Sequence, residues 1–166
     1  MYHPRMRHLL LFAAGLLTVA CTAQAPGSSV STTPPPLVPA APEFINVVEP
    51  WPYPFSSAVR AGDFVLLSGQ IGSEVVDGVP KLVAGGIEPE TRQTLENIKT
   101  ILAKAGSSLD KVVKCSVMIA DMAEWPKMNV VYATYFPGSK PARSAWGANG
   151  LALGARVEIE CIALAH

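Results

Sequence analysis

The sequence predicts an α+β fold in which a mixed β-sheet carries two helices on one face. Two segments, 88–105 and 128–135, have apolar residues at the spacing of an amphipathic helix. Around them lie short segments in which apolar residues alternate with polar ones, as in strands with one buried face. This order of elements is typical of a two-layer α+β domain. Helices on a single face leave the other sheet face open, so we expect the chain to self-associate.

Turn residues mark where the first strands begin and end. A Gly-Asp turn at 62–63 separates an expected strand at 58–61 from a second at 64–71. An Asp-Gly turn at 77–78 leads into a short third strand at 81–83. All three strands precede the first helix.

The first helix is expected between Glu88 and Gly106. Pro89 suits its first turn, and the acidic side chains of Glu88 and Glu90 favour the positive end of the helix dipole. Gly106 is a typical residue at which a helix ends. The apolar stripe consists of Leu95, Ile98, Leu102 and Ala105.

The second helix has a less regular beginning. Asp121 and Glu124 resemble a capping box, but Pro126 lacks the N–H group of a helix interior and indicates a slightly later start. Its end is expected at the Pro-Gly pair 137–138. The apolar stripe consists of Met128, Val131, Tyr132 and Tyr135.

Three more strands are expected at 111–120, 143–147 and 156–164. Cys115 and Cys161 lie inside two of them, and we expect both to point into the core as small apolar side chains. A disulfide between them is the alternative, which the spacing does not demand. One face of the first of these strands should consist of Val113, Cys115, Val117 and Ile119.

Composition argues against several classes of function. The 166 residues carry 13 Lys and Arg against 13 Asp and Glu, and no segment is basic enough to indicate nucleic-acid binding. The histidines, His3, His8 and His166, all lie near the ends of the chain. Its body therefore lacks the histidine of a Ser-His-Asp or Cys-His site and of most catalytic zinc sites.

Residues 1–20 are typical of a bacterial lipoprotein signal peptide. A positively charged start is followed by an apolar run too short to span a bilayer. The small residues before Cys21 resemble a lipobox and predict lipidation of this cysteine, although Thr18 stands where leucine is commoner. The alternative is ordinary cleavage after Ala25, which Pro26 disfavours.

The residues after Cys21 predict the arrangement of the exported protein. Residues 21–42 are rich in Pro, Ser, Thr and Ala, a composition typical of an extended tether. The folded domain is expected at 43–166. We therefore expect a domain held in the bacterial cell envelope by a lipid anchor, facing the periplasm.

One possible charge pair lies in the last two strands. Arg143 begins one strand and Glu158 lies inside the next. If the strands are close, a guanidinium faces a carboxylate, a pair suited to binding and protonating a small carboxylated substrate. An ion pair at the surface or between subunits is the alternative for each residue. Arg156, Glu158 and Glu160 should share one strand face.

Several short motifs occur in order between residues 54 and 163. They are SGQI at 68–71, TRQ at 91–93, LENIK at 95–99, NVVY at 129–132, PARS at 141–144 and VEIE at 157–160. Together they resemble the RidA (YjgF-like) family of enamine/imine deaminases. The resemblance implies a chorismate-mutase-like fold, a homotrimer with a site in each cleft between subunits, and no metal or organic cofactor. It also implies a hydrolase like 2-iminobutanoate/2-iminopropanoate deaminase, which converts 2-imino acids to 2-keto acids and ammonia.

The resemblance also gives roles to single residues. Arg143 matches the arginine that binds the substrate carboxylate through two parallel hydrogen bonds. Glu158 matches the glutamate that orients water and moves protons, and a dry cleft would raise its pKa. Asn129 matches a residue lining the pocket, and Gly69 lets the backbone approach a ligand. Otherwise Asn129 is an exposed helix residue and Gly69 ends a strand.

Two positions depart from the family pattern. Phe55 takes the place of a tyrosine and has no hydroxyl, which Tyr53 could supply only if the loop folds differently. Ala145, followed by the bulky Trp146, stands where a cysteine is often found. These changed walls leave two alternatives to catalysis: a non-catalytic binder of small carboxylic acids that uses the same cleft, and a purely structural trimer.

Overall fold

The computed structural model describes residues 41–48 and 52–166. In this part of the chain, the strands of the main sheet follow the order β1-β2-β3-β9-β7-β8, and β4 also pairs with β9. All pairs are antiparallel except β7 with β8, so the sheet is mixed. The strands are β1 (Glu43–Ile45), β2 (Ala58–Ala61), β3 (Phe64–Leu67), β4 (Gln70–Ile71), β7 (Val112–Ile119), β8 (Ala142–Gly147) and β9 (Val157–Leu164).

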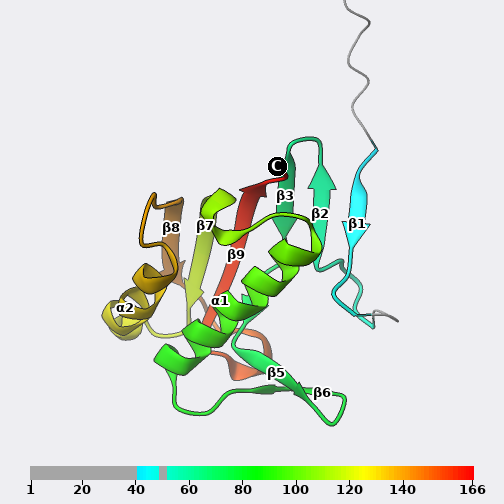
Figure 1. Cartoon of the computed structure of the whole chain (residues 1–166). Helices are drawn as coiled ribbons and strands as arrows, with labels where there is room; N and C mark the ends of the chain where they lie inside the picture. The colour runs from blue at the N-terminus through cyan, green and yellow to red at the C-terminus, as the bar shows by residue number, and fades with distance from the viewer. Residues whose placement is uncertain (1–40, 49–51) are drawn as a thin grey trace, which may run out of the picture. The chain divides into compact units, whose positions relative to one another are not determined.

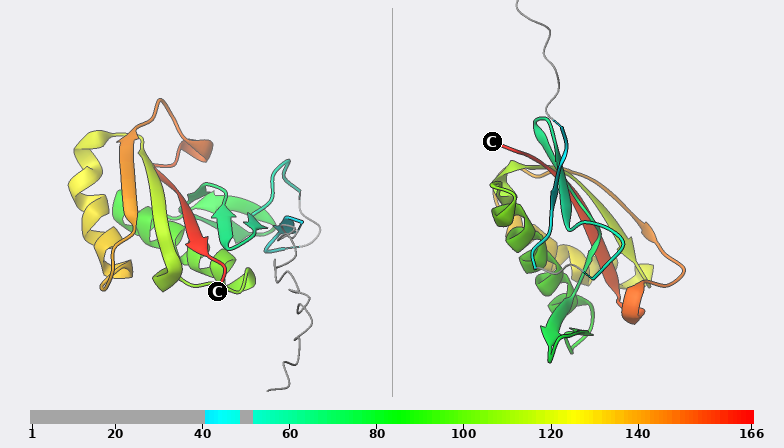
Figure 2. Two further views of the ribbon diagram at one scale, coloured as in Figure 1. Left: turned by 90° about the horizontal axis from the view of Figure 1, so that it is seen from above. Right: turned by 90° about the vertical axis from the view of Figure 1, so that its right-hand side faces the viewer.

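Two helices, α1 (Ile87–Lys104) and α2 (Trp125–Tyr135), pack on the same face of this sheet (Figures 1 and 2). The predicted α+β fold is confirmed. A separate hairpin of β5 (Ser73–Val76) and β6 (Val79–Leu82) precedes α1. No helix in the described part of the chain is long and apolar enough to cross a membrane. The signal peptide predicted at 1–20 and the lipidation predicted at Cys21 lie outside the described residues.

The core lies between the helices and the sheet face that they cover. Strand β9 shows the division clearly, because its side chains alternate between the two faces. Val157, Ile159, Cys161 and Ala163 are buried under the helices. Glu158, Glu160, Ile162 and Leu164 point to the other face, which we call the open face. Helix α1 completes the core with the fully buried Leu95, Ile98 and Leu102.

The ends of both helices follow from local sequence. Gly106 has a left-handed φ of 71° directly after the C-cap of α1, a conformation that glycine adopts without steric cost, so the predicted end is confirmed. Asp121 caps a separate 3₁₀ turn, Met122–Glu124, by accepting a hydrogen bond from the Ala123 N–H at 2.9 Å. Helix α2 therefore starts later, at Trp125, and Pro126 falls in the first turn, where its missing N–H is not needed.

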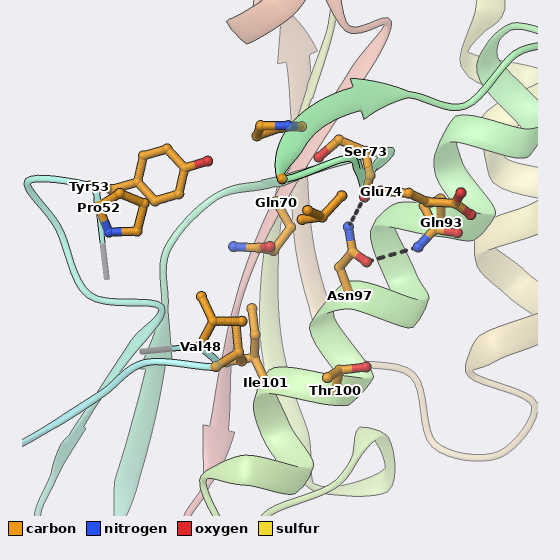
Figure 3. Close-up of a pocket in the computed structure, with 14 residues that line it drawn as sticks. Val48, Pro52, Tyr53, Gln70, Ser73, Glu74, Gln93, Asn97, Thr100 and Ile101 are labelled. Atoms are coloured by element: carbon orange, nitrogen blue, oxygen red, sulfur yellow. Dashed lines mark hydrogen bonds between the residues drawn. The ribbon is translucent and has the colours of Figure 1, made fainter. Parts of the chain in front are cut away.

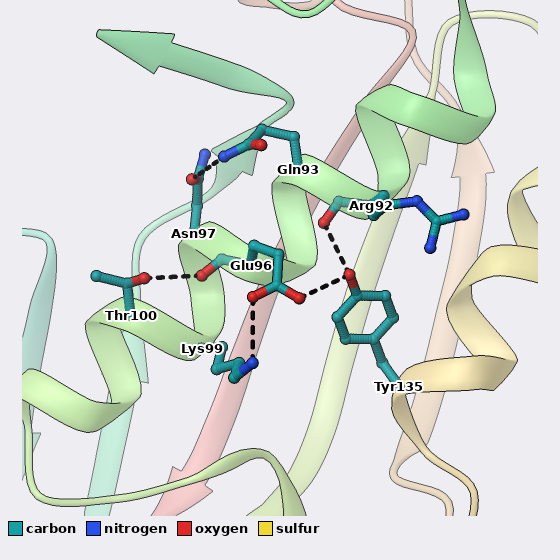
Figure 4. A network of polar contacts seen from close by, with 7 residues as sticks. All are labelled: Arg92, Gln93, Glu96, Asn97, Lys99, Thr100 and Tyr135. Atoms are coloured by element: carbon teal, nitrogen blue, oxygen red, sulfur yellow. Dashed lines mark hydrogen bonds and ion pairs between the residues drawn. The ribbon is translucent and has the colours of Figure 1, made fainter.

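Polar contacts join α1 to α2 outside the core (Figure 4). The Tyr135 hydroxyl of α2 donates a hydrogen bond to the Glu96 carboxylate of α1 at 2.9 Å. Lys99 forms an ion pair with the same carboxylate at 3.2 Å. The hydrogen bond from Tyr135, followed by that from Lys99, lowers the pKa of Glu96. The hydrogen bond between Tyr135 and Glu96 joins the two helices, and none of these three residues is a predicted site residue.

Cys115 and Cys161 form a disulfide bond, so the prediction of two free core thiols was wrong. The antiparallel register of β7 and β9 places the two residues directly opposite each other, with their Cα atoms 4.1 Å apart. Both side chains point to the helix-covered face and are buried. Separation along the chain does not reveal register, which is why the sequence left the pairing open.

Two predicted strands are less regular than expected. A register shift between Val112 and Lys114 turns Val113 away from the core, and Val113 is 40% exposed instead of sharing the buried face. The strand expected at 64–71 is interrupted after Leu67 and resumes as β4. The sequence also missed β1 and the partner strand β5 of the hairpin.

The open face carries a broad set of exposed apolar side chains. The register of β1, β2, β3 and β9 places aromatic and aliphatic residues side by side on it. Their exposed fractions lie between 39% and 68%. They are Phe44, Phe64, Leu66 and Leu164, and Trp146 of β8 lies on the same face. A face of this kind favours covering by another protein surface.

Candidate functional site

Glu158 lies near the start of β9, on the open face of the sheet. Its neighbours in the ladder are Met118 of β7 and Ile71 of β4. Burial raises the pKa of the Glu158 carboxyl above its usual value of 4.5, and the negative charge of Glu160 raises it further. This carboxyl can therefore exchange protons closer to neutral pH than an ordinary glutamate.

Gly69 lies against the Glu158 carboxylate. A Cβ atom at position 69 would overlap Oε1 of Glu158, so no larger residue fits without displacing the carboxylate. The glycine interrupts the strand between β3 and β4, where the side chain of Gln70 donates hydrogen bonds to the carbonyls of Ser68 and Gly69. The backbone at Gly69 was expected to lie close to a ligand; in the structure it lies close to the carboxylate of Glu158 of the same chain.

A cavity of about 450 Å³ opens beside this carboxylate. Among the described residues that line it, Glu158 is the only charged one, and most of its wall is apolar. Phe55 lines it together with Tyr53, and the two rings are stacked with centroids 5.5 Å apart. The loop therefore brings the phenol of Tyr53 to the cavity next to the phenylalanine that replaces the family tyrosine. The remaining lining residues are Gly69, Gln70, Ile71, Ser73, Pro80, Ala152 and Leu153.

Arg143 lies on β8 and points to the helix-covered face. It is the partner of Cys115 in the parallel ladder, and its guanidinium lies 4.6 Å from the ring centroid of Tyr132 on α2. A guanidinium over an aromatic face is held by a cation–π interaction. The hydroxyl of Tyr132 is buried and has no hydrogen-bond partner within the described residues. Burial raises the pKa of Tyr132 to about 12, while the charge of Arg143 acts in the opposite direction.

Asn129 and Ala145 belong to the neighbourhood of Arg143. Ala145 follows Arg143 by two positions on β8, so its side chain points to the same face. Asn129 is half-buried on α2 and lies three positions before Tyr132, on the adjacent turn of the same helix surface. These residues form a group with a fixed cation at one end of the sheet.

The predicted site residues therefore fall into two groups on opposite faces of the sheet. We call Arg143, Asn129 and Ala145 the arginine half-site, and Glu158, Gly69 and Phe55 the glutamate half-site. Strand β7 lies between β8 and β9 in the sheet. The expectation that Arg143 faces Glu158 was wrong for a single chain. Alternation along the strands sends the two side chains in opposite directions, which neighbouring positions in the sequence could not show.

The arginine two positions before Glu158 is paired with another carboxylate. Arg156, expected on the same strand face as Glu158, instead forms an ion pair with Glu124 at 2.6 Å. Its backbone N–H donates to the Glu90 carboxylate at 2.7 Å. Within residues 41–48 and 52–166, no group of three His, Cys, Asp or Glu side chains is placed to hold a metal ion.

A second cavity, of about 680 Å³, lies between α1 and the β5–β6 hairpin (Figure 3). Its polar wall includes Gln70, Gln93, Asn97 and Thr100, whose side chains already have hydrogen-bond partners. Asn97 donates to the carbonyls of Ile71 and Ser73 at 3.1 and 3.0 Å and accepts from Gln93 at 2.9 Å. These bonds anchor the bend between β4 and β5 to α1. The residues around the larger cavity thus hold β4, the strand that pairs with Glu158, against α1. The smaller cavity is the one lined by the Glu158 carboxyl.

Three residues that lie beside the two half-sites were not identified as site residues from the sequence. Tyr132 was assigned only to the apolar stripe of its helix, and Tyr53 only as a conditional source of a hydroxyl. Leu153, which lines the cavity beside Glu158, was not singled out by any sequence pattern. The sequence hint for Tyr132 was its place in the motif at 129–132 that also holds Asn129.

Comparisons with known proteins identify the family to which this fold belongs. A family model described as endoribonuclease L-PSP matches residues 49–165. The 2-iminobutanoate/2-iminopropanoate deaminase of Mus musculus is 43% identical over 111 residues, which cover 67% of this chain and 81% of the mouse protein. A Rid-family protein of unknown function from Yersinia pestis has a similar structure, with a TM-score of 0.68, 36% identity, and coverage of 75% of this chain and 99% of that one.

A third relative was solved with a ligand. The structure of Escherichia coli TdcF with bound serine matches with a TM-score of 0.62 at 29% identity, covering 73% of this chain and 92% of TdcF. The family model spans most of the described residues, and the mouse relative covers two thirds of the chain at high identity. The chain therefore belongs to the endoribonuclease L-PSP family, the family of the RidA (YjgF-like) deaminases.

Proposed function

We propose that this protein hydrolyses reactive 2-imino acids, or their enamine tautomers, to 2-keto acids and ammonia. The observation that carries the proposal is the pair of half-sites, one with a fixed cation and one with a carboxyl of raised pKa. A small carboxylated imine needs both, because its carboxylate must be bound and its nitrogen must receive protons. The name of the mouse relative, which covers the same part of the chain, supports this reaction.

The reaction follows from the chemistry of the two groups. The Arg143 guanidinium binds the substrate carboxylate through parallel hydrogen bonds. Glu158 accepts a proton from a water molecule while the water oxygen bonds to the imine carbon, and it then passes this proton to the imine nitrogen. A second proton then passes from the new hydroxyl through Glu158 to the nitrogen. The C–N bond breaks, ammonia leaves, and the C=O bond of the keto acid forms.

A complete site requires two copies of the chain, because one copy presents its half-sites on opposite faces. We propose that a homotrimer brings the arginine half-site of one subunit to the glutamate half-site of its neighbour. The apolar side chains on the open face support this assembly, since they remain exposed in a single chain. A trimer is also typical of the family to which the chain belongs.

The runner-up is a non-catalytic binder of small carboxylic acids that uses the same cleft. The relative TdcF, solved with bound serine, favours a small carboxylated ligand without indicating a reaction. The replacement of the family tyrosine by Phe55 also favours this alternative, since a hydroxyl has been lost from the wall of the cavity that Glu158 lines. Both functions share the Arg143 anchor and differ in what Glu158 does.

We also propose that the protein is exported and tethered by lipid at Cys21. The buried Cys115–Cys161 disulfide supports an oxidising compartment such as the periplasm, because disulfides persist there and are rare in the cytosol. The test is the full chain with Cys21→Ser expressed in bacteria. The variant should move from the membrane to the soluble periplasmic fraction, and unchanged fractionation would count against the anchor.

Activity is tested by generating 2-iminopropanoate in situ with an amino-acid oxidase and following its loss. Wild-type protein should accelerate the loss, and Arg143→Ala should abolish most of the acceleration because the carboxylate loses its anchor. Arg92→Ala is the matched control, since Arg92 is an exposed arginine on α1 outside both half-sites. If wild type gives no acceleration but calorimetry detects pyruvate binding that depends on Arg143, the protein is the binder.

A further inference from the structure

The wall of the glutamate half-site contains a leucine in an unusual conformation. Leu153 lies in the 3₁₀ turn Ala152–Gly154 with φ 56° and ψ 13°, in the left-handed region that side chains with a Cβ atom rarely adopt. The other non-glycine residue with positive φ among the described residues is Asp77, in the turn of the β5–β6 hairpin. Asp77 is of a type that tolerates this region, whereas leucine does not.

Leu153 gains no burial in the chain from this conformation. Its side chain is 62% exposed, although it lines the cavity beside Glu158. A residue that adopts a costly backbone conformation and still leaves its apolar side chain in water does not stabilise the core. Backbone conformations of this kind are found preferentially at functional sites, where they place a side chain for a ligand.

The side chains around Leu153 form an apolar surface. Phe55 is 50% exposed, and its ring stacks on that of Tyr53 at the same cavity. Pro80 and Ile71 add further apolar area, and the carboxyl of Glu158 is the one charge that the described part of the chain presents to the cavity. In the single chain this cavity has a volume of about 450 Å³, more than the methyl group of an alanine-derived substrate would fill.

We propose that Leu153 and Phe55 form a specificity subsite that binds the side chain of the substrate, and that the preferred substrates are 2-imino acids with bulky apolar side chains. This inference rests on the proposed function, because it names the substrate class of the same site. The loss of the tyrosine hydroxyl at Phe55 then has a positive role, since it makes this wall more apolar. Burying a branched or aromatic side chain against it supplies binding energy that a methyl group cannot.

The test compares imines generated in situ from alanine, leucine and phenylalanine. For wild-type protein, kcat/KM should be at least about tenfold higher for the leucine-derived than for the alanine-derived imine, because additional apolar carbons are discriminated by factors of this size. Leu153→Ala should lower that ratio about tenfold. Leu153→Asn should lower it as well while tolerating the left-handed backbone, which separates the side chain from the conformation.

Control variants keep the result interpretable. Val79→Ala removes a comparable exposed side chain from the neighbouring hairpin, outside the cavity, and should leave the ratio unchanged. Light scattering must show the same oligomer for wild type and every variant, because Leu153 would otherwise act through assembly. An unchanged ratio in Leu153→Ala, or a wild-type preference for the alanine-derived imine, overturns the subsite.

Calorimetry with the keto acids separates failure of the subsite from failure of the proposed reaction. Wild type should bind 4-methyl-2-oxopentanoate more tightly than pyruvate, and Leu153→Ala should remove the difference. If no imine is hydrolysed but this preference is found, the proposed reaction is wrong and the subsite stands as part of a binder. If hydrolysis occurs without any side-chain preference in rate or binding, the reaction stands and the subsite is wrong.

Discussion

Arg143 and Glu158 lie on opposite faces of one sheet, with β7 between their strands. The guanidinium rests on the ring of Tyr132 under the helices, while the carboxyl lies against Gly69 on the open face. A substrate that contacts both residues must therefore touch two copies of the chain. The proposed reaction therefore requires an oligomer, and mixing inactive variants tests this requirement.

Inactive variants should complement each other. Arg143→Ala and Glu158→Gln should each lower kcat/KM by about 100-fold or more, since each removes one half-site. Subunits of the two variants mixed in equal amounts, by unfolding and refolding together, should regain about a quarter of wild-type activity. That figure follows because three quarters of random trimers are mixed and each contains one intact site of three.

The control for complementation is each variant refolded alone, which should stay inactive. Mass spectrometry of the intact assembly should show the mixed trimers. If mixed trimers form without any recovery of activity, the site does not combine Arg143 of one subunit with Glu158 of another.

The pH dependence of activity should report Glu158. Burial and the charge of Glu160 raise the pKa of Glu158, so the acidic limb of kcat/KM should lie above pH 4.5. Glu160→Gln removes the second cause and should shift this limb to lower pH. The control is Glu88→Gln, which makes the same charge change on an exposed residue of α1. If the acidic limb of kcat/KM shifts equally in Glu160→Gln and Glu88→Gln, it does not report the titration of Glu158.

The raised pKa of Glu158 also makes the free energy of unfolding depend on pH. Between the usual pKa of 4.5 and the raised value, the folded chain holds a proton on Glu158 that the unfolded chain has released. The free energy of unfolding should therefore fall as pH rises through this window. Glu158→Gln, which carries no titrating proton, should lose this part of the pH dependence in urea unfolding curves measured from pH 4 to pH 8.

Gly69→Ala should separate activity from stability. The new methyl group overlaps Oε1 of Glu158, which lies at the end of a flexible side chain and can move away. We expect kcat/KM to fall at least about tenfold because the carboxyl is displaced, while the free energy of unfolding changes by less than about 1 kcal/mol. Gly138→Ala is the control, since nothing lies near its Cβ position. A large loss of stability in Gly69→Ala would contradict this reading.

Tyr132 should position Arg143 through its ring and not through its hydroxyl. Tyr132→Leu removes the ring and should raise KM roughly 3- to 10-fold, a factor in keeping with the strength of a cation–π contact. Tyr132→Phe keeps the ring and should leave KM unchanged. It should also raise the free energy of unfolding by up to about 1 kcal/mol, because it removes a buried hydroxyl without a partner among the described residues.

Tyr135→Phe is the matched control for this experiment. It also removes a tyrosine hydroxyl from α2, but one that donates a hydrogen bond to Glu96. This variant should lose stability without a change in KM. If Tyr132→Leu and Tyr132→Phe raise KM equally, the hydroxyl and not the ring acts on Arg143.

The disulfide should contribute substantially to stability. Cys115 and Cys161 are 46 residues apart. Closing a loop of this length lowers the entropy of the unfolded chain and so raises the free energy of unfolding by about 2–4 kcal/mol. The double variant Cys115→Ala, Cys161→Ala should unfold at correspondingly lower denaturant concentration. Cys21→Ser serves as the background, so that a thiol assay in denaturant should find no free thiol before reduction. Two free thiols would contradict the pairing.

Much of the architecture followed from local sequence. The stripe of Leu95, Ile98 and Leu102 predicted α1, and Gly106 predicted its end, because helix periodicity and backbone conformation are properties of neighbouring residues. The motifs around Arg143 and Glu158 identified the family for the same reason, since short segments in order carry the resemblance.

Only the tertiary structure decided how those segments combine. The register of β7 and β9 placed Cys115 opposite Cys161, and the parallel placement of β8 beside β7 set Arg143 under the helices and away from Glu158. The left-handed backbone conformation of Leu153 could not be predicted from the sequence either. Register, strand face and backbone conformation depend on pairing between distant segments, and a one-residue shift would reverse every side chain. The sequence indicated Arg143 and Glu158 as candidate site residues, and the pairing of strands determined that they lie on opposite faces of the sheet in one chain.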